Sequence, residues 1–404
     1  MKKTINISKL VFFFIVVGGF LIFALTFPYK LYSIGKNGII LDKDNYEELL
    51  KGKFISQSSS RVLADDGKDE IINEYVIDYK LFNMFNILSL KVKVSENSVY
   101  LGGDCLGFSL KTSGLLIVGS NYVFTKNGAI NPFMDSGLQV GDIIKSINNK
   151  EIAEIDELNN ILLKCNGEKL NLTVVRNGAE KNCEIVPQKD IFSGEYKLGL
   201  WVKNNTEGVG TLTFIEDDNM RFGSLGHAIY SSNTNSPLKI NSGQIYDCNV
   251  VGIKKGVDGT PGEIMGAFSK ENPLGEVDKN CEYGVYGYFD KTVQLLKEKP
   301  LISVGGRGSV NPGKALIFSS LDGENIESYE IEIIKANYQS SSNEKSLVFR
   351  VTDKKLLEKT GGIIQGMSGS PIVQNNKIIG AVTHVFVNDP TKGFGIYVDW
   401  MLLE

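Results

Sequence analysis

The sequence predicts a mainly β protein, α+β overall, with more than one folded domain. Its 404 residues leave room for two or three domains, and a hydrophobic fraction of 42% is enough for packed cores. The 43 glycines exceed the usual share and suit tight-turned β structure better than helical bundles. A net charge of -4 provides no basic surface, so nucleic acid is not an expected partner.

Residues 1–30 are predicted to form a cytoplasmic tip followed by a transmembrane anchor. Lys2, Lys3 and Lys9 precede an uncharged apolar segment, residues 10–27. At about 1.5 Å per residue this segment is just long enough to cross a bilayer, and the lysines hold its leading end in the cytoplasm. A cleaved signal peptide is the alternative. Both readings place everything after residue 30 outside the cytoplasm.

Residues 31–99 form an irregular, β-rich region. We expect strand structure over Leu81–Val94 and an exposed, charged loop over Ala64–Glu70.

Residues 100–190 are predicted to form a small domain of strands around one helix. The expected elements are a strand over Leu115–Val118, a helix with apolar residues at Ile155, Leu158, Ile161 and Leu162, and a strand over Leu170–Val175. This order resembles a PDZ domain. The resemblance assigns Leu106, Gly107 and Phe108 to the loop whose amides bind a peptide C-terminal carboxylate beside an open strand edge. The ligand is either a partner's tail or part of the same chain.

The segment Gly361–Ile372 has the composition of a nucleophile turn. Ser368 lies between Gly366 and Gly369, where missing side chains allow a tight bend and the approach of a carbonyl substrate. The turn and the strands that follow it resemble the end of a chymotrypsin-like serine peptidase. The resemblance implies two β-barrels over residues 191–404 and an oxyanion hole formed by the amides of Gly366 and Ser368. It also implies a substrate-binding strand at Thr383, His384 and Val385.

Only two histidines occur in the chain, so a Ser–His enzyme must use His227 or His384. His227 lies in a Gly-His-Ala sequence upstream of the serine, in the order expected for such a peptidase, and would accept the Ser368 proton. His384 is either a half-buried strand residue or part of the substrate groove.

The combination of an apolar N-terminal segment, a PDZ-like unit, Gly-His-Ala and Gly-Met-Ser-Gly-Ser-Pro resembles the stage IV sporulation protein B serine peptidases of endospore-forming bacteria. That resemblance implies export across the forespore inner membrane and cleavage of the peptidase's own chain. It further implies cleavage of a membrane-bound regulator, which activates an intramembrane metalloprotease that processes the late mother-cell sigma factor precursor.

The resemblance places the catalytic acid at Asp353, shortly before the nucleophile turn. Asp247, Asp258 and Asp278 are alternatives, because in ordinary chymotrypsin-like chains the acid comes from the first barrel. Asp353 could instead cap a helix at Lys354–Glu358.

No cofactor and no metal are expected. The cysteines at 105, 165, 183, 248 and 281 show no paired spacing, which favours buried thiols, and two histidines are too few for clustered ligands.

The pocket expected from Gly361–Gln365 and Gly393–Gly395 lacks an acidic floor, so a preference for Arg or Lys before the cut is not expected. Two alternatives to a signalling peptidase are a membrane-anchored PDZ adaptor with a degenerate peptidase domain and a general quality-control protease.

Overall fold

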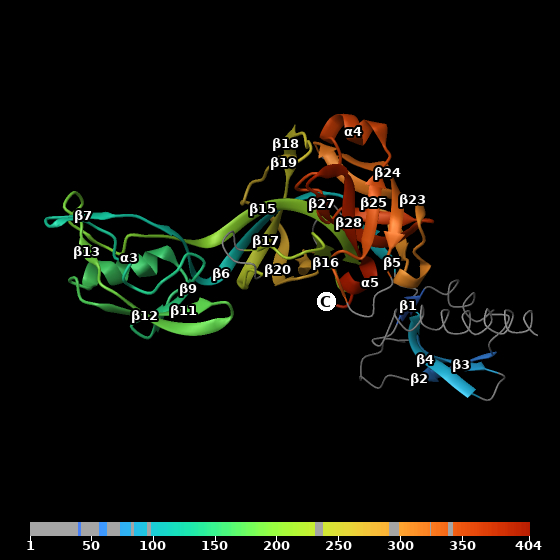
Figure 1. Cartoon of the computed structure of the whole chain (residues 1–404), viewed down its shortest axis with the longest axis horizontal. Helices are drawn as coiled ribbons and strands as arrows, with labels where there is room; N and C mark the ends of the chain where they lie inside the picture. The colour runs from blue at the N-terminus through green and yellow to red at the C-terminus, as the bar shows by residue number, and fades with distance from the viewer. Residues whose placement is uncertain are drawn as a thin grey trace, which may run out of the picture.

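The structure, a computed structural model, describes residues 39–41, 56–62, 73–81, 85–94, 98–230, 237–290, 299–323, 325–337 and 342–404. A small domain lies at one end of an elongated molecule, and two β-barrels lie in the middle (Figure 1). The expected membrane segment, residues 10–27, falls outside the described residues. Among the residues that are described, no helix combines the length and apolar character needed to span a bilayer.

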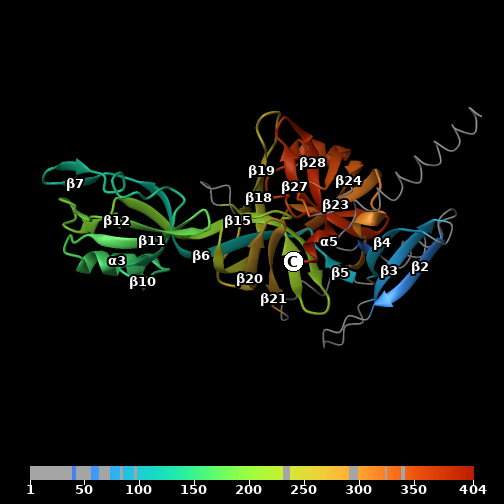
Figure 2. The same ribbon diagram turned by 60° about the horizontal axis from the view of Figure 1, so that its bottom comes forward.

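A four-stranded sheet lies at the other end of the molecule (Figure 2). Its strands are β1 (Ile39–Leu41), β2 (Ser56–Val62), β3 (Asn73–Leu81) and β4 (Phe85–Val94), in the order β1-β4-β3-β2. Of the strand structure expected over Leu81–Val94, Phe85–Val94 forms β4 and Leu81 is the last residue of β3; residues 82–84 lie outside the described residues. The expected loop at residues 64–70 lies outside the described residues.

Six antiparallel strands close the first barrel in the order β16-β21-β20-β17-β6-β15, with β15 pairing back to β16. They are β6 (Cys105–Ser120), β15 (Leu200–Glu216), β16 (Arg221–Ser224), β17 (Ile240–Asp247), β20 (Pro273–Cys281) and β21 (Gly284–Phe289). Alternating apolar residues on these strands, Phe108 and Phe222 among them, fill the interior.

Six further strands close the second barrel in the order β23-β24-β25-β28-β27-β26. They are β23 (Gly313–Asp322), β24 (Asn325–Ala336), β25 (Leu347–Val351), β26 (Pro371–Gln374), β27 (Lys377–Phe386) and β28 (Asp389–Tyr397). The two barrels expected from the sequence are therefore present. Strands β5 (Ser98–Leu101) and β22 (Leu301–Val304) join them, because β5 pairs with β15 and β22, and β22 pairs with β27.

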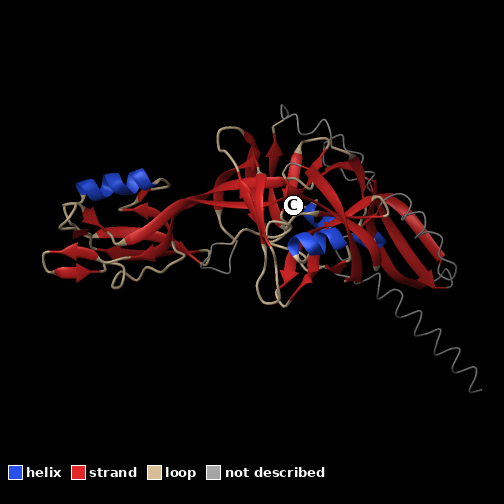
Figure 3. Cartoon of the chain, turned by 90° about the horizontal axis from the view of Figure 1, so that it is seen from above, coloured by secondary structure: helices blue, strands red, loops and turns tan. Residues whose placement is uncertain are grey.

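Among the described residues, the helices are short compared with the strands (Figure 3). The two barrels carry α4 (Lys354–Thr360), α5 (Val398–Met401) and the 3-10 turn η2 (Arg307–Ser309), with a hairpin of β18 (Asn249–Lys254) and β19 (Glu263–Ala267).

The small domain has its own core and one helix, α3 (Ile155–Lys164), as the apolar spacing predicts. The Glu157 carboxylate accepts the amides of Ala153 and Glu154 at 2.8 and 3.1 Å, which fixes the start of the helix. The strands of its main sheet are β9 (Ile143–Ile147), β10 (Lys150–Glu151), β11 (Leu170–Arg176) and β12 (Ala179–Ile185). Two short two-stranded sheets complete the domain. One pairs β7 (Val123–Thr125) with β8 (Gly128–Ile130), and the other pairs β13 (Gln188–Lys189) with β14 (Tyr196–Lys197). The cysteines are all free thiols, of which Cys105, Cys165 and Cys248 are buried.

The assignment of Leu106, Gly107 and Phe108 to a carboxylate-binding loop is wrong. These residues lie inside β6, where β15 pairs with one edge and β17 with the other. Leu106 and Phe108 are buried in the first-barrel core. Their amides are therefore not an exposed row beside an open edge. The apolar-Gly-apolar pattern fits a central barrel strand as well as it fits a loop, and the barrel strand is what forms.

Candidate active site

The nucleophile turn connects α4 to β26. Helix α4 ends at Gly361, whose φ of 79° is the left-handed conformation that glycine favours at a helix end. Gly369 has a φ of 95°, and a Cβ at this position would lie 2.0 Å from the carbonyl oxygen of Thr211. Only glycine allows the turn to approach β15 this closely.

Two threonines of β15 hold this turn against the first barrel. The Thr211 hydroxyl donates to the carbonyl of Gly366 at 2.7 Å, and the Thr211 amide donates to the carbonyl of Ser368 at 2.9 Å. The Thr213 hydroxyl donates to the carbonyl of Gly369 at 2.8 Å. A strand of one barrel thus positions the Ser368 turn of the other. Sequence analysis assigned no role to these threonines, although their alternation in Gly-Thr-Leu-Thr puts both hydroxyls on one face.

The backbone of the turn leaves two amide donors without a protein acceptor. Within the described part of the chain, the amides of Gly366 and Ser368 donate no hydrogen bond, whereas the amide of Gly369 donates to the carbonyl of Val382 at 2.8 Å. Gly366 and Ser368 both line the same cavity. These are the two amides that the sequence assigned to an oxyanion hole, and they are available for that purpose.

His227 follows a strained turn at the end of β16, in which Leu225 and Gly226 have φ values of 67° and 68°. Its Nδ1 lies 2.8 Å from the carbonyl oxygen of Ala228. Since a carbonyl oxygen can only accept, Nδ1 carries the proton and Nε2 holds the lone pair. Burial lowers the pKa of His227 below its ordinary value. The side chain is therefore a neutral imidazole whose Nε2 lone pair can accept a proton.

His384 lies beside His227, with ring centroids 4.9 Å apart. Burial, and next the neighbouring His227, lower the pKa of His384 to about 4, so it is neutral near pH 7. Its Nε2 is 4.0 Å from a carboxylate oxygen of Glu344, and within the described residues its buried Nδ1 has no hydrogen-bond partner. Glu344 was not singled out by sequence analysis.

Ser368 and His227 line one cavity of about 500 Å³ between the barrels. Thr383, His384 and Val385 line it too, as do Ile363, Ile364 and Gln365 of the expected specificity pocket, whereas Gly393–Gly395 do not. The Ser368 hydroxyl donates to the carbonyl of Thr383 at 2.7 Å. The structure thus brings His227 and Ser368 together with the expected oxyanion and substrate-groove residues, whereas Asp353, Gly361, Gly362 and Gly393–Gly395 lie outside this cavity.

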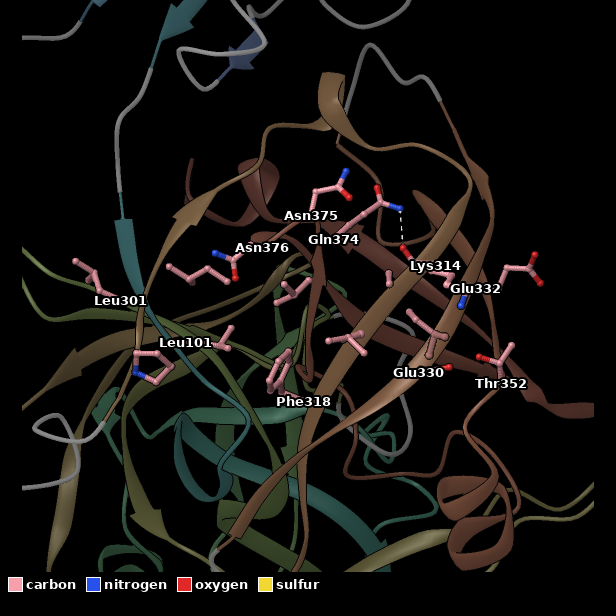
Figure 4. Close-up of a pocket in the computed structure, with 16 residues that line it drawn as sticks. Leu101, Leu301, Lys314, Phe318, Glu330, Glu332, Thr352, Gln374, Asn375 and Asn376 are labelled. Atoms are coloured by element: carbon pink, nitrogen blue, oxygen red, sulfur yellow. Dashed lines mark hydrogen bonds between the residues drawn. The ribbon is translucent and has the colours of Figure 1, made fainter.

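A larger cavity of about 680 Å³ lies elsewhere, between strands of the second barrel and the joining strands β5 and β22. Figure 4 shows its lining, which includes Phe318, Glu330 and Gln374. Gln374 there donates to the carbonyl of Lys314 at 3.2 Å. None of the residues that line this cavity also lines the one that contains Ser368. Size alone therefore does not identify the reactive site.

Asp353 is not among the residues of the Ser368 cavity. One of its carboxylate oxygens accepts the amide of Leu356 at 2.9 Å, which caps α4, and the other accepts the amide of Glu330 at 3.3 Å. The alternatives Asp247, Asp258 and Asp278 do not line the cavity either, and Asp278 is paired with Arg221. In this structure the Ala228 carbonyl, not a carboxylate, fixes the His227 tautomer.

We expect Asp353→Asn to retain peptidase activity within a few-fold of the unmodified chain. Asparagine caps a helix about as well as aspartate, so stability should also change little. An aspartate that orients the catalytic imidazole costs about 10⁴ in kcat when replaced by asparagine. Measuring kcat and the unfolding midpoint separates the two roles, and a loss of that size without unfolding would make Asp353 the orienting acid. Asp353→Ala serves as the control, and it should lower stability by about 1 kcal/mol through loss of the cap.

The lowered pKa of His227 also leads to a prediction for the pH dependence of activity, with His227 as the expected base. The base works only when neutral, so activity is lost as pH falls through the pKa of the folded state. Because that pKa lies below about 6.5, the acid limb of kcat/KM should have its midpoint below pH 6.5. Stability should also decline below pH 6.5, because both histidines bind protons more readily in the unfolded chain. A midpoint above 6.5 in the kcat/KM profile would contradict this assignment.

Comparison with known proteins assigns two parts of the chain to families. The profile of the SpoIVB peptidase S55 family matches residues 194–402, more than half of the chain, and a PDZ domain profile matches residues 106–186. Among solved structures, the chain is similar to the Rv3671c protease in its inactive form, at 14% identity and a TM-score of 0.27 over 48% of this chain and 83% of that one. It is also similar to an inactive mutant of Rv3671c from M. tuberculosis H37Rv, at 14% identity and a TM-score of 0.26 over 48% and 80%. The chain therefore belongs to the SpoIVB peptidase S55 family and is a serine peptidase with a PDZ domain.

Proposed function

We propose that this serine peptidase is a signalling endopeptidase in which Ser368 is the nucleophile and His227 the general base. The observation that carries this proposal is that both residues, contributed by different barrels, line one cavity, with Nε2 of His227 unprotonated. Ser368 Oγ attacks the carbonyl carbon of the scissile bond while its proton passes to Nε2. The amides of Gly366 and Ser368 stabilise the negative oxygen that forms.

The remaining steps use the same groups. The C–N bond breaks as the His227 imidazolium gives its proton to the leaving amine, which leaves an acyl group on Ser368. A water molecule then attacks the acyl carbon, and its proton passes through His227 back to Ser368 Oγ. The products are a free amine and a free carboxylic acid, so each cut consumes one water molecule.

The substrate backbone is proposed to bind along β27. The ladder between β27 and β28 shifts register between Val382 and Val385, which leaves Thr383 and His384 out of it. The buried Nδ1 of His384 faces no protein partner within the described residues. A substrate in this groove would displace the Ser368 hydroxyl from the Thr383 carbonyl and turn it toward His227.

The biological role that we propose is sporulation signalling. In this proposal the residue 10–27 segment anchors the chain in the forespore inner membrane, and the catalytic part works outside the cytoplasm. The peptidase cleaves its own chain and then a membrane-bound regulator of an intramembrane metalloprotease. The family match and the presence of a PDZ domain, which suits selection of a few protein partners, support this role.

The number of bonds cut tests the signalling role. We expect the full chain, purified in detergent, to cleave itself at few sites and to leave β-casein largely intact over the same period. Mass spectrometry of the fragments would count the sites. Extensive degradation of β-casein would favour a quality-control protease, and no cleavage of either protein would favour the adaptor role.

A further inference from the structure

The segment that follows His227 is held by the side chain of Asn280, which lies on β20. The Oδ1 atom of Asn280 accepts the amide of Ile229 at 2.8 Å, and its Nδ2 donates to the carbonyls of Ile229 and Leu238, both at 2.9 Å. A main-chain amide only donates and a carbonyl only accepts, so this carboxamide fits in one orientation, with both Nδ2 hydrogens used. Asn280 lies 51 residues from Ile229 in the sequence, so no local pattern indicates the contact.

The peptide group between Ala228 and Ile229 connects this contact to the imidazole. Its carbonyl, that of Ala228, lies 2.8 Å from Nδ1 of His227. Its amide, that of Ile229, is the one that donates to Asn280. Because a peptide group is planar, a hydrogen bond that holds its N–H also fixes the direction in which its carbonyl points. The Asn280 side chain therefore holds the acceptor that decides which nitrogen of His227 carries the proton.

Hydrogen bonds at both ends polarise this peptide group. The Asn280 oxygen attracts the amide proton of Ile229, which strengthens the carbonyl oxygen of the same group as an acceptor. Ala228 is only 1% exposed, so little water competes for that oxygen. A carbonyl in this position can do part of what the carboxylate does in a Ser-His-Asp triad, because it fixes the tautomer and stabilises the imidazolium.

The surrounding contacts keep the peptide group from turning. The amide of Leu238 donates to the carbonyl of Ile229 at 2.9 Å. Leu238 is buried against Leu116 and Ile143, which lie within the residues that match the PDZ profile. Asn280 itself lies in the ladder between β20 and β21. The segment is thus tied to the first barrel on one side and to the PDZ domain on the other.

We propose that Asn280 is a positioning residue of the peptidase: through the peptide group between Ala228 and Ile229, it holds His227 with the proton on Nδ1 and the lone pair on Nε2. Asn280 is not among the described residues that line the cavity containing Ser368, so it acts through this peptide group and does not touch the reacting atoms. The proposal rests on the function of His227 as the general base proposed above.

The first test measures how strongly Ser368 is activated, in the full chain and in Asn280→Ala. The probe is a fluorophosphonate, which forms a covalent bond only with an activated serine. Without Asn280 the Ala228 carbonyl can turn away from Nδ1 of His227. We expect the labelling rate to fall about 10²-fold, the size of loss that follows when a catalytic group is misplaced by about 1 Å.

Gln374→Ala is the matched control, because the Gln374 carboxamide makes the same set of contacts elsewhere. It accepts the amide of Asn311 at 3.1 Å and donates to the carbonyls of Asn311 and Lys314, at 2.9 and 3.2 Å. Gln374 lies in the second barrel and is not among the described residues that line the Ser368 cavity. Its variant should lose about as much stability as Asn280→Ala, yet keep the labelling rate within about twofold.

The second test reads the tautomer of His227 by nitrogen NMR, because a residue that only stabilises the fold would leave the tautomer unchanged. The full chain is prepared with isotope-labelled histidine and without a histidine tag, so its only histidines are His227 and His384. The variant His384→Gln identifies the His227 signals. We expect the His227 proton on Nδ1 in the unmodified chain and in Gln374→Ala, and about half of that population to be lost in Asn280→Ala.

An unchanged labelling rate or an unchanged tautomer in folded Asn280→Ala would overturn the positioning role and leave His227 and Ser368 as the proposed pair. Equal losses in Gln374→Ala would overturn it as well, because they would trace the effect to stability. Asn280→Ser replaces Asn280→Ala if the latter does not fold, and failure of both to fold would make Asn280 a structural residue and reject the proposal. If the unmodified chain does not react with the fluorophosphonate, the proposed function fails, and the tautomer alone then decides whether Asn280 holds His227.

Discussion

Replacing Ser368 by alanine is expected to reduce peptide cleavage by a factor of at least about 10⁴ while leaving the fold unchanged. The hydroxyl is a reactant, and no neighbouring group can supply the oxygen that forms the acyl bond. Its contribution to stability is small, because it makes one hydrogen bond, to the carbonyl of Thr383, worth about 1 kcal/mol. Following self-cleavage on a gel, together with the unfolding midpoint, measures both effects.

Ser370→Ala is the matched control for this experiment. Ser370 lies two residues after Ser368 and is fully buried, and its hydroxyl has no hydrogen-bond partner within the described residues. Removing that hydroxyl should leave cleavage within a few-fold of the unmodified chain and should not lower stability. Fragments of equal yield from Ser368→Ala and from the unmodified chain would reject Ser368 as the nucleophile.

The second large effect is expected from Gly369→Ala. The new Cβ would lie 2.0 Å from the carbonyl of Thr211, and the φ of 95° is itself strained for alanine. The turn must move away from β15, and a displacement of about 1 Å costs about 10² in rate where geometry is critical. We therefore expect kcat to fall at least a hundredfold, together with a lower unfolding midpoint.

Gly313→Ala isolates the clash from the backbone strain. Gly313 has a φ of 134°, and nothing lies within 4 Å of the Cβ position, so only the conformational cost is added. Its destabilisation should be about 1 kcal/mol, with kcat unchanged. If both variants lose the same stability and keep the same kcat, the close approach of the nucleophile turn to β15 does not govern catalysis.

The sequence was most informative where one residue type or one local pattern leaves few choices. Two histidines and one Gly-x-Ser-Gly turn were enough to predict that His227 and Ser368 line one cavity, and the apolar spacing in residues 155–162 was enough to predict α3. Both features depend on short stretches of chain whose chemistry is specific.

The failures share a different physical cause. The Leu106-Gly107-Phe108 pattern suits a loop as well as a strand, and only the pairing of β6 with two strands shows that it lies in a barrel. Asp353 precedes a helix, and a carboxylate at this position could either cap the helix or orient a catalytic histidine. The hydrogen bond from the Leu356 amide to Asp353 shows that it caps the helix. The hydrogen bond from the Thr211 hydroxyl to the Gly366 carbonyl joins residues 155 positions apart in the sequence. No local sequence pattern reveals a contact over that separation.

The claim on which the mechanism depends is that His227 activates Ser368. The most direct measurement is the rate and position of covalent labelling by a fluorophosphonate, which reacts only with an activated serine. We predict a single adduct, located by mass spectrometry on Ser368, and a labelling rate at least about 10³-fold lower in His227→Ala. Labelling of another residue, or equal labelling rates in the unmodified chain and in His227→Ala, would contradict the mechanism.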